Sequence, residues 1–193
     1  MAEDNPLDKL RVAKETEYFR KQEEALLREL RRRAALADER NQLSAATRID
    51  DERVLQDLEE LGFHPDTAIL LPILPLVEVA WAEGGVSTRE RDLILELASA
   101  RGVRPDTPAY RKLSEWLSAY PGDDFFTKTR EANARMIAAL PPDQREASAR
   151  DLASQAKRVA EASGGVFGLG KISPKEAKLI DKIVAELRSA GGG

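Results

Sequence analysis

Cysteine is absent from this chain, and histidine, methionine and aromatic residues are scarce. Without cysteine there is no disulfide framework, no thiolate nucleophile and no zinc site built on sulfur. The single histidine, His64, is not accompanied by the Gly-x-Ser-x-Gly turn of a serine hydrolase. The abundant carboxylates fall on charged helix faces, where solvated acids are the usual finding. We therefore expect that the protein is not an enzyme, and a hydrolase-like activity is the weakest alternative.

Long apolar runs and an excess of positive charge are also missing. The most apolar stretch, residues 68–82, is shorter than a membrane-spanning helix, is interrupted by Pro72 and Pro75, and carries Glu78. The formal net charge is -4, so no overall positive field attracts nucleic acid. The first residues do not resemble a signal peptide. These observations predict a cytoplasmic protein that neither spans a membrane nor binds nucleic acid.

The overall amino-acid composition favours helices. Apolar residues make up 42% of the chain and charged residues 33%, and runs of β-branched residues are absent. We expect an all-α fold with three parts. Residues 1–49 are predicted to form a charged helical extension, residues 50–190 a multi-helix domain, and residues 191–193 a disordered glycine tail.

The extension is predicted to be one long helix over residues 7–48, because no glycine or proline interrupts it. Arg33 and Arg40 fall on its thin apolar seam, which weakens a coiled coil. Two interpretations stay open: a solvated helix, and a helix that binds protein partners or forms a homodimer. The apolar positions of the seam are Leu26, Leu30 and Ala37.

Two short turns share one pattern, Gly-x-(Val/Ile)-Ser-x-x-Glu-x-x-Leu-Ile. In the first turn Gly84-Gly85 ends an apolar helix, and Ser87 and Glu90 have the spacing of a capping box that starts the next helix. In the second turn Ser173 and Glu176 repeat this spacing, with proline at the first helical position. The repeat predicts paired helical hairpins that are related by pseudo-symmetry and pack on each other. The residues expected to be mostly buried are Trp81, Leu93, Ile94, Leu97, Leu179, Ile180 and Ile183.

The first turn reads Ala82-Glu83-Gly84-Gly85-Val86-Ser87, followed by Glu90. It resembles the Ala-Asp-Gly-x-(Ile/Val)-Ser-x-x-Glu signature of the TerB-like family, which includes tellurite-resistance TerB proteins and the N-terminal region of DjlA co-chaperones. The resemblance extends over roughly residues 62–190. It implies a TerB-like helical domain with a non-catalytic role in stress response or tellurite resistance. It also implies action through protein partners, including peripheral association with the inner membrane surface.

Acidic residues near the first turn provide an alternative function. Carboxylate oxygens suit calcium or magnesium, so Glu83, Glu90 and Glu78 are the candidate ligands of a divalent-metal-binding sensor. The turn is too short for an EF-hand loop, and Glu90 is already explained as a capping residue. Glu83 stands where the family has aspartate, and the second turn has Leu169 at the equivalent place. A structural hairpin is therefore the preferred interpretation.

Residues 165–173 nearly spell a phosphate-binding loop, Gly-x-x-x-x-Gly-Lys-(Ser/Thr). Ile172 occupies the place of the hydroxyl residue, and a helix rather than a strand is predicted before the loop. We therefore expect no nucleotide and no other cofactor, apart from the divalent cation considered above.

Overall fold

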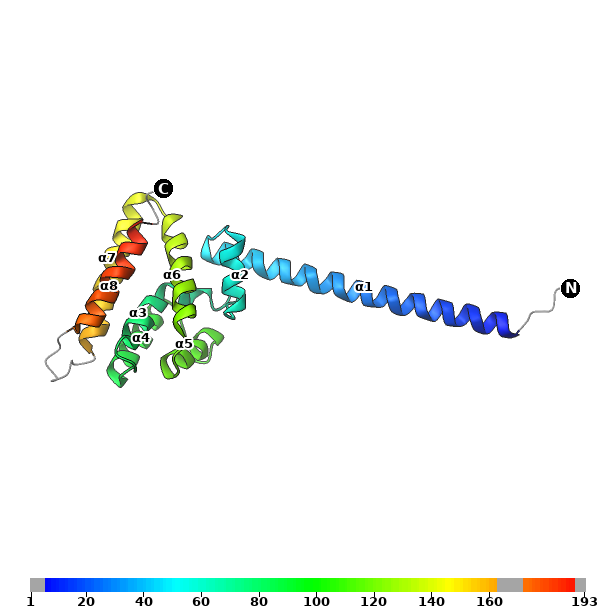
Figure 1. The fold of residues 1–193 in the computed structure, drawn as a ribbon, viewed down its shortest axis with the longest axis horizontal. Helices are drawn as coiled ribbons and strands as arrows, with labels where there is room; N and C mark the ends of the chain where they lie inside the picture. The colour runs from blue at the N-terminus through cyan, green and yellow to red at the C-terminus, as the bar shows by residue number, and fades with distance from the viewer. Residues whose placement is uncertain (1–5, 163–171, 190–193) are drawn as a thin grey trace. The chain divides into compact units, whose positions relative to one another are not determined.

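The structure is a computed structural model that describes residues 6–162 and 172–189. Within these ranges it contains eight α-helices and one 3₁₀ helix, η1, and no strand (Figure 1). The predicted all-α fold is therefore confirmed. The glycine tail at 191–193 and most of the loop at 165–173 lie outside the described residues. The helices are α1 (Pro6–Thr47), α2 (Glu52–Glu60), η1 (Ala68–Ile73), α3 (Leu74–Trp81), α4 (Thr88–Ala100), α5 (Pro108–Ser118), α6 (Asp123–Ala138), α7 (Pro142–Ala162) and α8 (Pro174–Ser189).

The chain divides into two compact units between Asn41 and Gln42. In the first unit, the described side chains of α1 are almost all exposed, and ion pairs such as Lys21–Glu17 at 2.7 Å lie along the helix. This agrees with the charged helix predicted from the sequence. The second unit holds the buried apolar core.

The observed boundary lies before the predicted one between residues 49 and 50, because the last turn of α1 belongs to the second unit. Leu43 and Thr47 are each 1% exposed, and Ile49 is 2% exposed. The Thr47 hydroxyl donates to the Leu43 carbonyl at 2.8 Å, which satisfies the polar group inside this core. Residues 42–47 continue the helix without a glycine or proline, so nothing local in the sequence marks this boundary.

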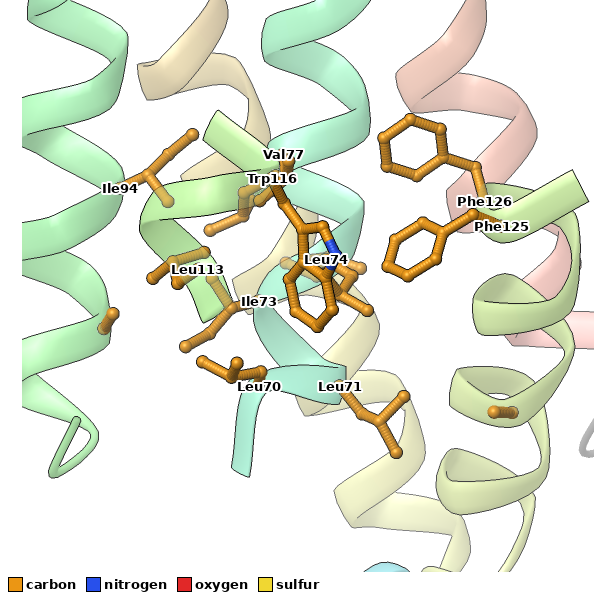
Figure 2. Packing of buried hydrophobic residues seen from close by; sticks show 14 of the residues in the cluster. Leu70, Leu71, Ile73, Leu74, Val77, Ile94, Leu113, Trp116, Phe125 and Phe126 are labelled. Carbon is orange, nitrogen blue, oxygen red and sulfur yellow. The ribbon is translucent and has the colours of Figure 1, made fainter. Parts of the chain in front are cut away.

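The most apolar stretch lies at the centre of the second unit. A break at its prolines was expected, and the chain forms the 3₁₀ helix η1 around Pro72 before α3 begins at Leu74. Figure 2 shows the side chains of both elements among residues from neighbouring helices. Leu70, Leu71, Ile73, Leu76, Val77 and Val79 all have no measurable exposure.

Two helical hairpins pack against each other, as predicted. One consists of α3 and α4 and the other of α7 and α8, and α7 contacts both α3 and α4. The predicted core residues Ile94, Ile180 and Ile183 are buried. The expectation was too strong for four others, which are only half-buried at the edge of the core: Trp81, Leu93, Leu97 and Leu179.

Candidate functional site

Both turns form the predicted capping boxes. The Ser87 amide donates to Glu90 Oε2 at 2.8 Å, and the Glu90 amide donates to Ser87 Oγ at 3.3 Å. The corresponding distances between Ser173 and Glu176 are 2.7 and 3.2 Å. Gly84 has φ +89°, a conformation that favours glycine, so it can end the turn after α3. The two capping boxes are therefore alike in structure as well as in sequence.

The capping glutamates are buried, which is unusual for carboxylates. Glu90 is 2% exposed and Glu176 is 1% exposed. Burial raises the pKa of Glu90 above its ordinary value, outweighing the hydrogen bonds from Ser87, and the charges of Glu176 and Glu83 act in the same direction as burial. The two capping glutamates therefore lie close enough for the charge of Glu176 to affect the pKa of Glu90. The second oxygen of Glu176, Oε1, is buried and receives no hydrogen bond from the described residues.

The structure does not gather the three predicted metal ligands around one point. Glu83 is exposed beside a shallow hollow, Glu90 is held in its capping box, and Glu78 forms an ion pair with Arg130 of α6. Among residues 6–162 and 172–189 no group of three or more histidine, cysteine or acidic side chains could hold a metal ion. The metal interpretation therefore receives no support from the geometry.

Glu78 instead belongs to an ion-pair cluster in which Arg130 joins three helices. Its carboxylate in α3 accepts from Arg130 in α6, and Arg130 also donates to Glu186 of α8 at 3.0 Å. The side chains of Glu78 and Arg130 are 11% and 12% exposed. Burial raises the pKa of Glu78, while the charge of Arg130 acts in the opposite direction. This arrangement identifies Glu78 as a packing residue of the second unit.

A cavity of about 420 Å³ lies in a different part of the second unit. The last turn of α1, η1, the end of α4, α6 and α7 contribute to its wall. Its lining combines apolar side chains such as Met136, Ile137 and Leu152 with Arg48, Arg101 and the buried Asn133. No motif in the sequence marks this site, because its residues come from five separate segments of the chain.

An exposed apolar face on α1 is the other feature with the character of a binding surface. Leu26 and Leu30 of the predicted seam are 60% and 51% exposed. Phe19, which the predicted seam did not include, is 67% exposed.

In the described part of the chain no helix is long and apolar enough to cross a membrane.

Comparison of the chain with protein-family models, curated proteins and solved structures gives no match. The resemblance to the TerB-like family thus rests on the turn motif alone.

Proposed function

We propose that this protein is a non-catalytic helical interaction protein of the cytoplasm, and that one face of α1 binds a second copy of the chain. The exposure of Phe19, Leu26 and Leu30 carries this proposal. At 3.6 residues per turn these side chains lie within about 20° of one line along the helix, and Ala37 continues the line. Large apolar side chains gathered on one exposed face are typical of a protein-binding surface.

Charges on the same seam indicate the direction of pairing. Glu23 and Arg33 occupy heptad positions between the apolar residues of the seam. In an antiparallel pair that crosses near residue 28, Glu23 lies opposite Arg33 of the second copy. The same register sets Phe19 opposite Ala37, a large residue against a small one, and Leu26 opposite Leu30. A parallel pair would instead set Glu23 against Glu23 and Arg33 against Arg33, which is unfavourable.

The flanks of the seam fit the same register. Close to the crossing point, Leu27 lies opposite Leu27 of the second copy on one side of the seam and adds apolar contact. On the other side Glu29 faces Glu29, but each carboxylate already accepts hydrogen bonds from Arg32 and Arg33 at 2.9 to 3.2 Å. Glu23 forms no ion pair with any described side chain, so its carboxylate is available to the second copy.

The cellular role follows from the resemblance to the TerB-like family. We propose that the helical domain acts in a stress response related to tellurite resistance, binding further protein partners that can hold it at the inner membrane surface. The repeated capping box supports this, since it is the part of the family signature that the chain forms twice. A strain that lacks the chain should grow less well on tellurite, and the Leu26→Glu variant should fail to restore growth.

Sedimentation velocity over a range of protein concentrations tests the pairing. The full chain should dimerise as its concentration rises, and Leu26→Glu should remove the dimer. The matched control is Tyr18→Glu, because Tyr18 is 60% exposed but lies off the seam. This control should dimerise like the wild type.

Charge reversal tests the direction. Glu23→Arg and Arg33→Glu should each weaken the dimer, because each places like charges opposite one another, and the double variant should restore it. Restoration is specific to the antiparallel register, since a parallel pair keeps like charges together in every variant. A chain that stays monomeric at all concentrations, or a double variant no better than the single ones, would contradict the proposed pairing.

A further inference from the structure

The cavity between α1, α6 and α7 has the size and lining of a small-molecule site. Its volume of about 420 Å³ falls within the range of about 300–1,000 Å³ that is usual for such sites. Pro72, Met136, Ile137, Leu140 and Leu152 provide an apolar wall. All of the lining residues belong to the second unit, so the cavity is complete within one compact body.

Asn133 supplies a fixed hydrogen-bond acceptor in this apolar wall. The residue is 4% exposed, and its amide nitrogen donates to the carbonyls of Leu71 at 2.8 Å and Thr129 at 2.9 Å. Both amide hydrogens are therefore used within the protein. The oxygen Oδ1 receives no hydrogen bond from the described residues, and the side chain lines the cavity. A ligand with an N–H or O–H group would satisfy it.

Arg48 supplies a positive charge at the same cavity. Its side chain is exposed and forms no ion pair or hydrogen bond with the described residues. Arg101, the other arginine of the lining, donates to Gln155 at 2.7 Å and lies 3.6 Å from the carboxylate of Asp151. The charge of Arg101 is thus balanced inside the protein, whereas that of Arg48 is available to a ligand.

The backbone conformation at Arg48 is one that arginine rarely adopts, which points to a functional reason for an arginine at this position. Arg48 has φ 59°, and its amide closes α1 on the Ser44 carbonyl at 2.7 Å. Glycine or asparagine usually occupies this position after a helix, because other side chains are strained there. The chain carries an arginine at a position where glycine would be more stable, and strained positions of this kind cluster at functional sites.

From these contacts we propose that the cavity binds a small organic acid with an apolar body and one hydrogen-bond donor. The carboxylate pairs with Arg48, the donor bonds to Asn133 Oδ1, and the apolar body packs against Met136, Ile137 and Leu152. This site is independent of the pairing surface on α1, since the two share no residue.

Calorimetric titration of the full chain with indole-3-acetate tests the proposal, because this probe combines a carboxylate, a flat apolar ring and one N–H donor. We expect saturable binding of one molecule per chain. Octanoate lacks the donor and tryptamine carries the opposite charge, so both should bind more weakly. Nuclear magnetic resonance spectra should show a shift of the Asn133 side-chain amide signals on addition of indole-3-acetate.

Arg48→Gly separates binding from folding. This variant should be as stable as the wild type or more so, and should bind indole-3-acetate about tenfold more weakly or worse, as expected for a lost charged contact. Asp106→Gly is the matched control, because Asp106 is the other non-glycine residue with positive φ in the described chain and does not line the cavity. It should leave binding unchanged. Absence of saturable binding to the folded wild type, or equal binding by Arg48→Gly, would overturn the proposal.

Discussion

The boundary between Asn41 and Gln42 makes a quantitative prediction about two shortened chains. A chain that begins at Gln42 keeps the last turn of α1, whereas a chain that begins at Asp50 loses it. The lost segment, residues 42–49, carries Leu43 at 1% exposure and Ile49 at 2% exposure. Complete burial of such a side chain contributes about 1.5–3 kcal/mol, so the two together contribute about 3–6 kcal/mol. Domain stabilities are typically about 5–15 kcal/mol, so this loss is a large part of the total.

Urea unfolding followed by far-ultraviolet circular dichroism measures the difference. The chain from Gln42 should unfold in one cooperative transition, and the chain from Asp50 should unfold at much lower urea or be unfolded at the start. In the full chain Leu43→Ala should cost about 2–5 kcal/mol. Leu36→Ala, at a residue 54% exposed in the first unit, should cost less than about 0.5 kcal/mol. Equal stability of the two shortened chains would show that the last turn of α1 is not part of the core.

Three further predictions concern the acidic residues. The pKa of Glu90 is raised in the folded state, so the stability that Glu90 contributes is fully present below its unfolded pKa and is lost as pH rises through the folded value. Glu90→Gln, which can keep the capping box, should therefore be more stable than the wild type at pH 8 in urea unfolding, and this advantage should shrink towards pH 4. Arg130→Met leaves Glu78 buried without its ion-pair partner and should lower the free energy of unfolding by about 3–5 kcal/mol, whereas Arg130→Met combined with Glu78→Leu should recover part of the loss. Calcium and magnesium should leave the melting temperature unchanged, and a saturable rise that Glu83→Gln removes would instead establish the metal-binding alternative.

Local features were predictable from the sequence because their causes lie within a few residues. The spacing of Ser87 and Glu90, and of Ser173 and Glu176, predicts both capping boxes, and the bonds form as expected. The break at Pro72 follows in the same way from the missing amide of proline. The contact between the two hairpins also agrees with the apolar spacing that follows each turn.

Features that depend on distant segments were not predictable in this way. Glu78 is a candidate metal ligand by sequence, and nothing near it in the chain indicates its ion pair with Arg130 of α6. Arg48 adopts positive φ without the glycine that would have signalled it. The cavity joins Arg48 to Asn133 across the fold, and no spacing in the sequence connects these residues.

The placement of Trp81 and Trp116 makes tryptophan fluorescence and helical ellipticity two separable signals of folding. The indole N–H of Trp81 donates to the Trp116 carbonyl at 2.8 Å, and these are the only tryptophans of the chain. Both lie in the second unit, so tryptophan emission reports the packing of that unit alone. Helical ellipticity also includes the residues of α1 before Gln42. Heating one sample while recording both signals therefore resolves the melting of the first unit from that of the second, without any label.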